Sequence, residues 1–184
     1  MHTSQLQRGF TILELIIAIA LVAVLSALAV PNLRNAIQNN RLTAQANDFV
    51  VAFQLARSEA IKRGQPVSVC ATDANDGGDE PVCGDDWSLG WMVIVDGAAS
   101  EGTNAVTLVD RIRVWRPSND GIGIAVPDDV EFFRYLPRGD IDTASGATFP
   151  VVITMDIDDC TGDQVRQIRI ARVGSASVNR VECS

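Results

Sequence analysis

The N-terminal sequence places one carboxylate inside a long apolar stretch. Glu14 follows the run Arg8-Gly9-Phe10-Thr11-Ile12-Leu13, and apart from it only Thr11 and Ser26 are polar between positions 10 and 30. A charged side chain at the centre of a membrane helix costs roughly 2.5–3.5 kcal/mol even on lenient scales, so Glu14 requires a partner. No Lys or Arg lies between positions 10 and 33. If the chain is cut after Gly9, the nearest cation is the new α-amine of Phe10, in the same chain or in a neighbour, and the expected chemistry is a structural ion pair.

The segment from 10 to 30 has the length of a membrane-crossing helix. Its residues would span about 31 Å at about 1.5 Å per residue, which matches the hydrocarbon core of a bilayer. A secretory signal peptide places its apolar stretch before a small-residue cleavage site, whereas here the polar residues 1–9 come first. We therefore expect a removable leader at 1–9 and a retained transmembrane helix at 10–30.

The helix is expected to continue beyond the membrane segment as an amphipathic helix over 31–63. Glycine is absent from 10 to 63, and Gly64 followed by Pro66 is a stop signal. Pro31 interrupts the hydrogen-bond ladder and is expected to kink the helix. One apolar stripe repeats at steps of four and three residues: Leu42, Ala46, Phe49, Phe53, Ala56 and Ala60. We predict that this stripe packs on a sheet, with a coiled-coil partner as the alternative.

The remaining residues, 64–184, are expected to form one antiparallel β domain. Short β-branched and aromatic runs are separated by Gly, Asp and Asn, which is typical of strands. The predicted strands are 67–70, 91–95, 112–115, 131–135, 149–157 and 167–170. No helical pattern lies between them, so the predicted class is α+β, one long helix covered by antiparallel sheet.

The four cysteines, Cys70, Cys83, Cys160 and Cys183, all follow the apolar segment. Their even number fits disulfide bonding in an oxidising compartment. We predict the pairs Cys70–Cys83 and Cys160–Cys183, although the sequence leaves the two other pairings open. A zinc site is the rival interpretation, but no two cysteines have the close spacing of zinc ligands.

Composition argues against catalysis and against a nucleic-acid binder. The only histidine, His2, lies in the leader, and leader removal changes the formal charge from 15 − 23 = −8 to 14 − 23 = −9. Without histidine, Ser-His-Asp and Cys-His chemistry are excluded, and we expect no enzyme, no cofactor and no metal. The acidic segment 73–86 has Gly84 at the twelfth position, where a calcium loop has its chelating glutamate. Trp87 and Trp91 are expected in the core rather than in a recognition patch.

The junction Gly9-Phe10-Thr11-Ile12-Leu13-Glu14-Leu15, followed by an apolar helix with Pro31, resembles type IV pilins and the pseudopilins of type II secretion. The resemblance implies that a prepilin peptidase cleaves after Gly9 and methylates Phe10. It also implies that Glu14 docks on the N-terminal amine of an adjacent subunit. The protein is then expected in the inner membrane as a single-pass protein, with its C-terminal domain in the periplasm before it enters a filament.

Segments of the predicted helix and of the following strand are similar to the GspH/FimT group of minor pilins and pseudopilins. They are 40–43, 55–64, 86–87 and 90–96. The group serves both the type IV pilus and the type II secretion pseudopilus, and the segment from Ser58 to Gly64 slightly favours the pilus. Other pilin-like subunits are the implied partners, and the machine and the position in the filament stay open.

DNA binding is the alternative function. Some FimT-like proteins bind DNA through a glycine followed by arginines, and the matching stretch here is Gly174-Ser175-Ala176-Ser177, without arginines. The weak candidates are Arg166, Arg169, Arg172 and Arg180, which are more simply explained as a solvated strand face.

Overall fold

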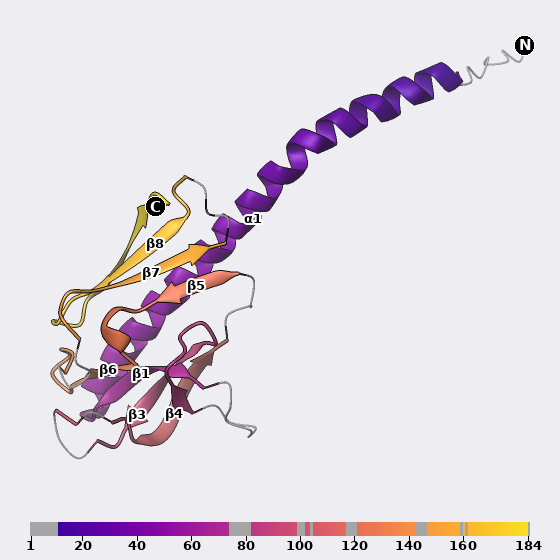
Figure 1. Ribbon diagram of the computed structural model, residues 1–184. Helices are drawn as coiled ribbons and strands as arrows, with labels where there is room; N and C mark the ends of the chain where they lie inside the picture. Colours follow the sequence, from indigo (N-terminus) through magenta and orange to yellow (C-terminus); the bar gives the residue numbers. More distant parts are fainter. Residues whose placement is uncertain are drawn as a thin grey trace, which may run out of the picture. The chain divides into compact units, whose positions relative to one another are not determined.

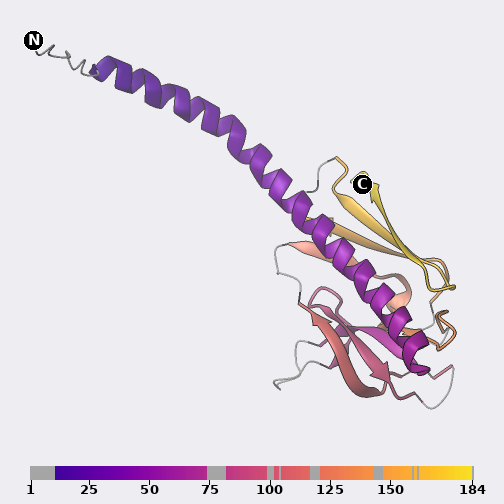
Figure 2. The same cartoon turned by 180° about the vertical axis from the view of Figure 1, so that it is seen from behind.

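The computed structural model describes residues 11–73, 82–98, 102–103, 105–116, 121–142, 147–158, 160 and 162–183, apart from the side chains of 28–32 and 128. Its internal contacts divide the chain into two units, Met1–Asn39 and Asn40–Ser184. The helix α1 passes through both units, and all of the described strands belong to the second. Figures 1 and 2 show the strands of this second unit against the C-terminal part of α1.

The helix α1 runs over Ile12–Arg63, 52 residues, close to the prediction of 10–63. It ends where the stop signal predicts, because Gly64 adopts the left-handed conformation, with φ of 65°, and its N–H donates to the Ala60 carbonyl at 3.0 Å. The helix continues through position 31; the Pro31 side chain lies outside the described residues, and the kink stays a prediction.

In the described part of the chain, no helix is both long enough and apolar enough to qualify as a candidate membrane span. The transmembrane segment predicted for 10–30 starts outside the described residues and stays a prediction.

The strands form two antiparallel sheets. The first has the order β2 (Cys83–Gly84), β1 (Val67–Thr72), β3 (Trp91–Asp96) and β4 (Leu108–Trp115), and β6 (Phe132–Tyr135) also pairs with β1. The second has the order β5 (Ile122–Ala125), β7 (Val151–Ile157), β8 (Val165–Ile170) and β9 (Ala176–Val181). A short 3₁₀ turn, η1 (Pro127–Asp129), follows β5. The predicted α+β class, a long helix on antiparallel sheets, is confirmed.

Three strands of the structure lie outside the six predicted ones. β2 has only two residues, which is too short for any periodic signal. β5 contains a glycine and is half exposed, and β9 alternates small and polar residues with single valines. Strands at a sheet edge bury little apolar surface, so they lack the β-branched runs on which the prediction relied. The stretch from Gly174 to Ser177, which was compared with the DNA-binding pattern, comprises the end of a turn and the first residues of β9.

The predicted apolar stripe of α1 is the core of the second unit. Each of its members is fully buried: Leu42, Ala46, Phe49, Phe53, Ala56 and Ala60. Phe49 packs edge-on against Trp91, with ring centroids 4.8 Å apart, and Phe53 packs against Phe133 at 5.1 Å. The alanines leave room for the sheets to approach the helix. The stripe thus packs on the sheets of its own chain, as predicted, and not on a coiled-coil partner.

A buried arginine holds the first sheet to the segment that follows β3. The guanidinium of Arg134 on β6 donates to Asp96 at 2.7 Å and to Asp142 at 3.3 Å, and the three side chains are at most 3% exposed. The same guanidinium also donates to the carbonyls of Thr103 and Ala105, each at 2.6 Å. Asp96 also accepts a hydrogen bond from Ser68 at 2.7 Å. The charge of Arg134 is therefore fully paired inside the fold.

Two glycines allow turns from the two sheets to touch beside α1. Gly174 has φ of 83°, and a Cβ atom on it would lie 2.3 Å from the Gly139 carbonyl oxygen. The Tyr135 hydroxyl donates to the Gly174 carbonyl at 3.1 Å, and burial raises the pKa of Tyr135 well above its ordinary value. The Ile141 N–H donates to the Arg172 carbonyl at 2.9 Å. The sheets are joined here by close backbone contact that only glycine permits.

Replacing Arg134 tests the buried ion pairs. Arg134→Met leaves Asp96 and Asp142 buried without their cation, and we expect the unfolding free energy to fall by about 3–5 kcal/mol. Urea unfolding of the full chain in detergent micelles, followed by tryptophan fluorescence, measures it. The exposed Arg169→Met is the matched control and should stay within about 0.5 kcal/mol of the parent. An equally small change for Arg134→Met would contradict the assignment.

Candidate functional site

The first turn of α1 holds Glu14 in a reciprocal cap with Thr11. Thr11 precedes the helix, and its hydroxyl accepts a hydrogen bond from the Glu14 N–H at 3.2 Å. In return the Glu14 carboxylate accepts from the Thr11 N–H at 3.4 Å and from its hydroxyl at 3.5 Å. This is the capping-box arrangement of Thr-x-x-Glu. The sequence analysis missed this role, although the spacing Thr11-Ile12-Leu13-Glu14 displays it.

Both side chains of this cap are exposed at the helix N-terminus. The carboxylate there is compatible with the partial positive charge of the helix end, and it is accessible to a partner from another chain. Gly9 and Phe10, the predicted cleavage and methylation residues, lie outside the described residues. The predicted ion pair between Glu14 and an N-terminal amine therefore stays a prediction.

Both disulfides are present with the predicted pairing. Cys70 bonds to Cys83, which ties β1 to the short strand β2, and Cys160 bonds to Cys183, which fastens the end of the chain after β9. None of the described cysteines is free. Among the described residues there is also no group of carboxylate, thiol or imidazole side chains placed to hold a metal ion. Most of the acidic segment 73–86 lies outside the described residues.

The structure separates the four arginines named as weak DNA candidates. Arg166 is buried at 1% exposure and its guanidinium donates to the Thr43 hydroxyl of α1 at 3.0 Å. Burial lowers the pKa of Arg166, and the charge of Arg180 acts in the same direction. Arg180 pairs with Arg166 across β8 and β9, whereas Arg169 lies on the opposite face of β8. Arg172 is exposed in the following turn. The four do not form one basic surface.

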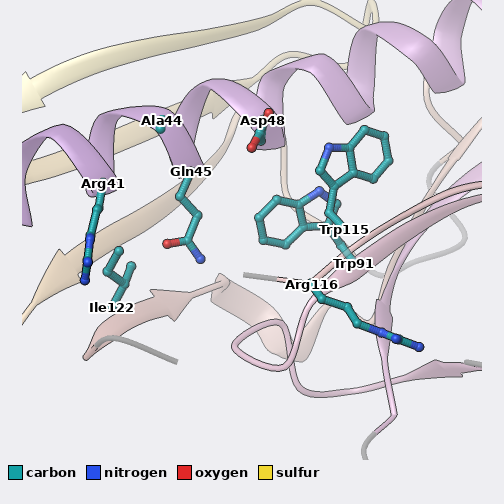
Figure 3. Close-up of a pocket in the computed structure, with 8 residues that line it drawn as sticks. All are labelled: Arg41, Ala44, Gln45, Asp48, Trp91, Trp115, Arg116 and Ile122. Atoms are coloured by element: carbon teal, nitrogen blue, oxygen red, sulfur yellow. The ribbon is translucent and has the colours of Figure 1, made fainter. Parts of the chain in front are cut away.

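The predicted burial of Trp87 and Trp91 is confirmed, at 4% and 1% exposure. Trp91 also lines a cavity of about 230 Å³ beneath α1, together with Trp115. Figure 3 shows the two indoles below the helix, with Gln45 reaching down from it and Asp48 lying against the helix. The other lining residues are Arg41, Ala44, Arg116 and Ile122. The sequence analysis missed this cavity, because its residues come from α1, β3, β4 and β5.

A capped helix with a carboxylate at its exposed start, and a disulfide-bonded antiparallel domain on its second half, define a pilin-like subunit. A family model described as a prokaryotic N-terminal methylation motif matches residues 5–30. The model of the Type II transport protein GspH matches residues 45–174, well over half of the chain. The chain belongs to the GspH family. It is thus a minor pilin or pseudopilin of a type II secretion system or a type IV pilus, and its role is structural, not enzymatic.

Solved structures with a similar fold include the type IV minor pilin FimU of Pseudomonas aeruginosa in two crystal forms. The first has a TM-score of 0.53 and 20% identity, covering 76% of this chain and 89% of FimU. The second has a TM-score of 0.51 and 18% identity, covering 74% and 91%. None of the curated proteins compared with the chain matches it. At these identities the likeness is one of fold, and it agrees with the predicted pilin-like architecture.

The disulfides can be tested on the full chain extracted in detergent. We expect no cysteine to react with iodoacetamide before reduction, and peptide mapping should link Cys70 with Cys83 and Cys160 with Cys183. Each bridge restricts the unfolded chain, so its reduction should lower the unfolding free energy by about 2–4 kcal/mol. Complete alkylation of the native protein without reductant would contradict the assignment, and so would peptides with crossed linkages.

Proposed function

We propose that the chain becomes a subunit of a periplasmic filament, or of the complex that starts one, after cleavage between Gly9 and Phe10 and methylation of Phe10. The match of residues 5–30 to the methylation motif carries this proposal. In the filament the carboxylate of Glu14 binds the N-terminal amine of a neighbouring subunit. Its exposed position at the start of α1 supports this role.

The motif implies an inner-membrane anchor and processing by a prepilin peptidase, and the family implies assembly with other pilin-like subunits. For the machine we propose the type IV pilus, supported by the segment Ser58 to Gly64 and by the fold shared with FimU. The family's description as a type II transport protein favours the secretion pseudopilus. Loss of pili with normal secretion after deletion of the gene would support the pilus.

DNA uptake is not our proposal for this chain. The net charge of the chain is −8. Of the four candidate arginines Arg166 is buried, and Arg169 lies on the opposite face of β8 from the pair Arg166 and Arg180. Phosphate binding depends on several cations that act together. A structural role for Arg166 at the junction of β8 with α1 accounts for it without DNA.

Processing gives a direct test of the N-terminus. Mass spectrometry of the chain from membranes of a strain with active prepilin peptidase should show Phe10 as the first residue, with one added methyl group. The control is the same gene in a strain without the peptidase, which should retain Met1 to Gly9. An intact leader in both strains would falsify the proposed maturation.

Three variants separate the two roles of the helix start. Glu14→Ala removes both the cap and the charge, and Glu14→Gln keeps a capping amide but removes the charge. Thr11→Ala weakens the cap and keeps the charge, and it should lower the stability of the first helical turn by about 1 kcal/mol. If Glu14 binds an amine, both Glu14 variants should be depleted from sheared filaments at least about tenfold, because a charge-assisted bond is worth roughly 1.5–3 kcal/mol.

The Thr11→Ala variant should enter filaments at close to the parental level. Membrane fractions provide the second measurement, since both Glu14 variants should insert as well as the parent or better. Normal incorporation of Glu14→Gln, with loss only in Glu14→Ala and Thr11→Ala, would assign Glu14 to capping alone and would overturn the intermolecular role.

A further inference from the structure

Two buried indole donors face each other across β3 and β4 without acceptors. Trp91 and Trp115 are directly opposed in the register of these strands, and they are 1% and 7% exposed. Neither indole N–H donates to any described protein acceptor, and both nitrogens are buried. A buried donor without a partner costs about 1–3 kcal/mol. The folded state therefore carries an unfavourable desolvation free energy at two adjacent positions.

A third tryptophan in the same core shows the contrasting case. Trp87 is 4% exposed, and its indole N–H donates to the Val130 carbonyl at 2.8 Å. Its ring lies 5.5 Å from that of Phe49, which also packs on Trp91. An indole that only packs in this core thus has an acceptor for its N–H group. Trp91 and Trp115 have no such acceptor, which indicates a role beyond packing.

The surroundings of Trp91 and Trp115 favour an anion. They line the cavity of about 230 Å³ beneath α1. Figure 3 shows Gln45 reaching down from the helix and Arg41 to one side, whereas the Arg116 guanidinium points away from the indoles. The guanidinium of Arg113 also lies 4.6 Å over the Trp115 ring. Asp48 is the only acidic lining residue. The cavity thus combines indole, amide and guanidinium donors, on a chain of net charge −8.

We propose that this cavity binds the carboxylate of an aspartate or glutamate side chain from a neighbouring pilin-like subunit, an inference that rests on the proposed function. A carboxylate has two acceptor oxygens, which matches a pair of indole N–H donors beside guanidinium groups. The volume is below the roughly 300–1,000 Å³ of a site for a free organic ligand, and it suits one side chain. This chain carries 23 acidic against 15 basic residues, and a pilin-like neighbour of similar composition would offer such a carboxylate.

Access requires a small movement at the cavity wall. The two indole nitrogens are buried in this structure, so a carboxylate reaches them only after neighbouring side chains move. The NMR signals of the two indole N–H groups therefore report directly whether a carboxylate occupies the cavity.

The test is NMR titration of the ¹⁵N-labelled full chain in zwitterionic detergent micelles, following its indole N–H signals. The probe is N-acetyl-aspartate N-methylamide, and the matched neutral probe is N-acetyl-asparagine N-methylamide. We expect saturable downfield shifts for Trp91 and Trp115, which Trp91→Phe and Trp115→Phe variants assign. The Trp87 signal should stay in place because its N–H already has an acceptor. No shift, equal shifts with both probes, or equal shifts of all three indoles would overturn the proposal.

Variants test the charge of the cavity. Arg41→Gln should weaken binding of the aspartate probe about tenfold, as expected for loss of a charged hydrogen bond. Arg169→Gln, on the far face of β8, is the matched control and should leave the affinity unchanged. Equal affinities of the two variants would remove the basis for carboxylate recognition.

Acetate and a photo-crosslinker distinguish the sources of the carboxylate. Binding of acetate as tight as that of the aspartate probe would point to a free small carboxylate and overturn the subunit part of the proposal. A benzophenone residue at Ala44, on the cavity lining, should crosslink in cells to an acidic segment of a second pilin-like subunit, and Arg41→Gln should abolish that crosslink. If processing and the Glu14 variants behave as proposed but the indole signals do not move, this inference fails and the proposed function stands.

Discussion

Burial of one stripe of α1 is the interaction on which the C-terminal unit depends. The stripe combines alanines, which bring the sheet backbones close, with Phe49 and Phe53, which fill the space between strands. The first sheet packs on these rings through Trp91 and Phe133. The second sheet is tied to an earlier turn of the helix by Arg166 and Thr43. Because burial of apolar surface is the dominant favourable term in folding, the sheets have no comparable core without this helix.

Long periodic signals were readable from the sequence, and short or non-periodic ones were not. The helix stripe repeats with the period of a helix, β7 alternates in burial, and β1 and β3 are short runs buried throughout, so the class and the core were predictable. The Arg134 network was not, because Asp96, Arg134 and Asp142 meet only after the first sheet has formed. The same holds for the cavity at Trp115. The capping role of Glu14 is readable from the sequence, because Thr11 and Glu14 have the spacing of a capping box.

Glu14 illustrates how one side chain can serve a free subunit and an assembled one. Within a single chain its carboxylate accepts from Thr11 at distances of 3.4–3.5 Å, which are long for hydrogen bonds to a charged acceptor. In the filament we propose, an amine from a neighbour would offer a shorter, charge-assisted bond. Exchange of the weak local cap for this partner would give assembly a favourable electrostatic step, while the cap limits the cost of the carboxylate before assembly.

The fold treats its buried polar groups in two different ways. The guanidinium of Arg134 donates hydrogen bonds to the Asp96 carboxylate and to two backbone carbonyls, in a site closed to solvent. Trp91 and Trp115 remain without acceptors although Gln45 and Asp48 line the same cavity. Since the same core provides an acceptor for the Trp87 indole, we assign the open donors at the cavity to a partner outside the chain. Such a partner would recover their desolvation cost at the moment of assembly, so that part of the binding free energy is already stored in the free subunit.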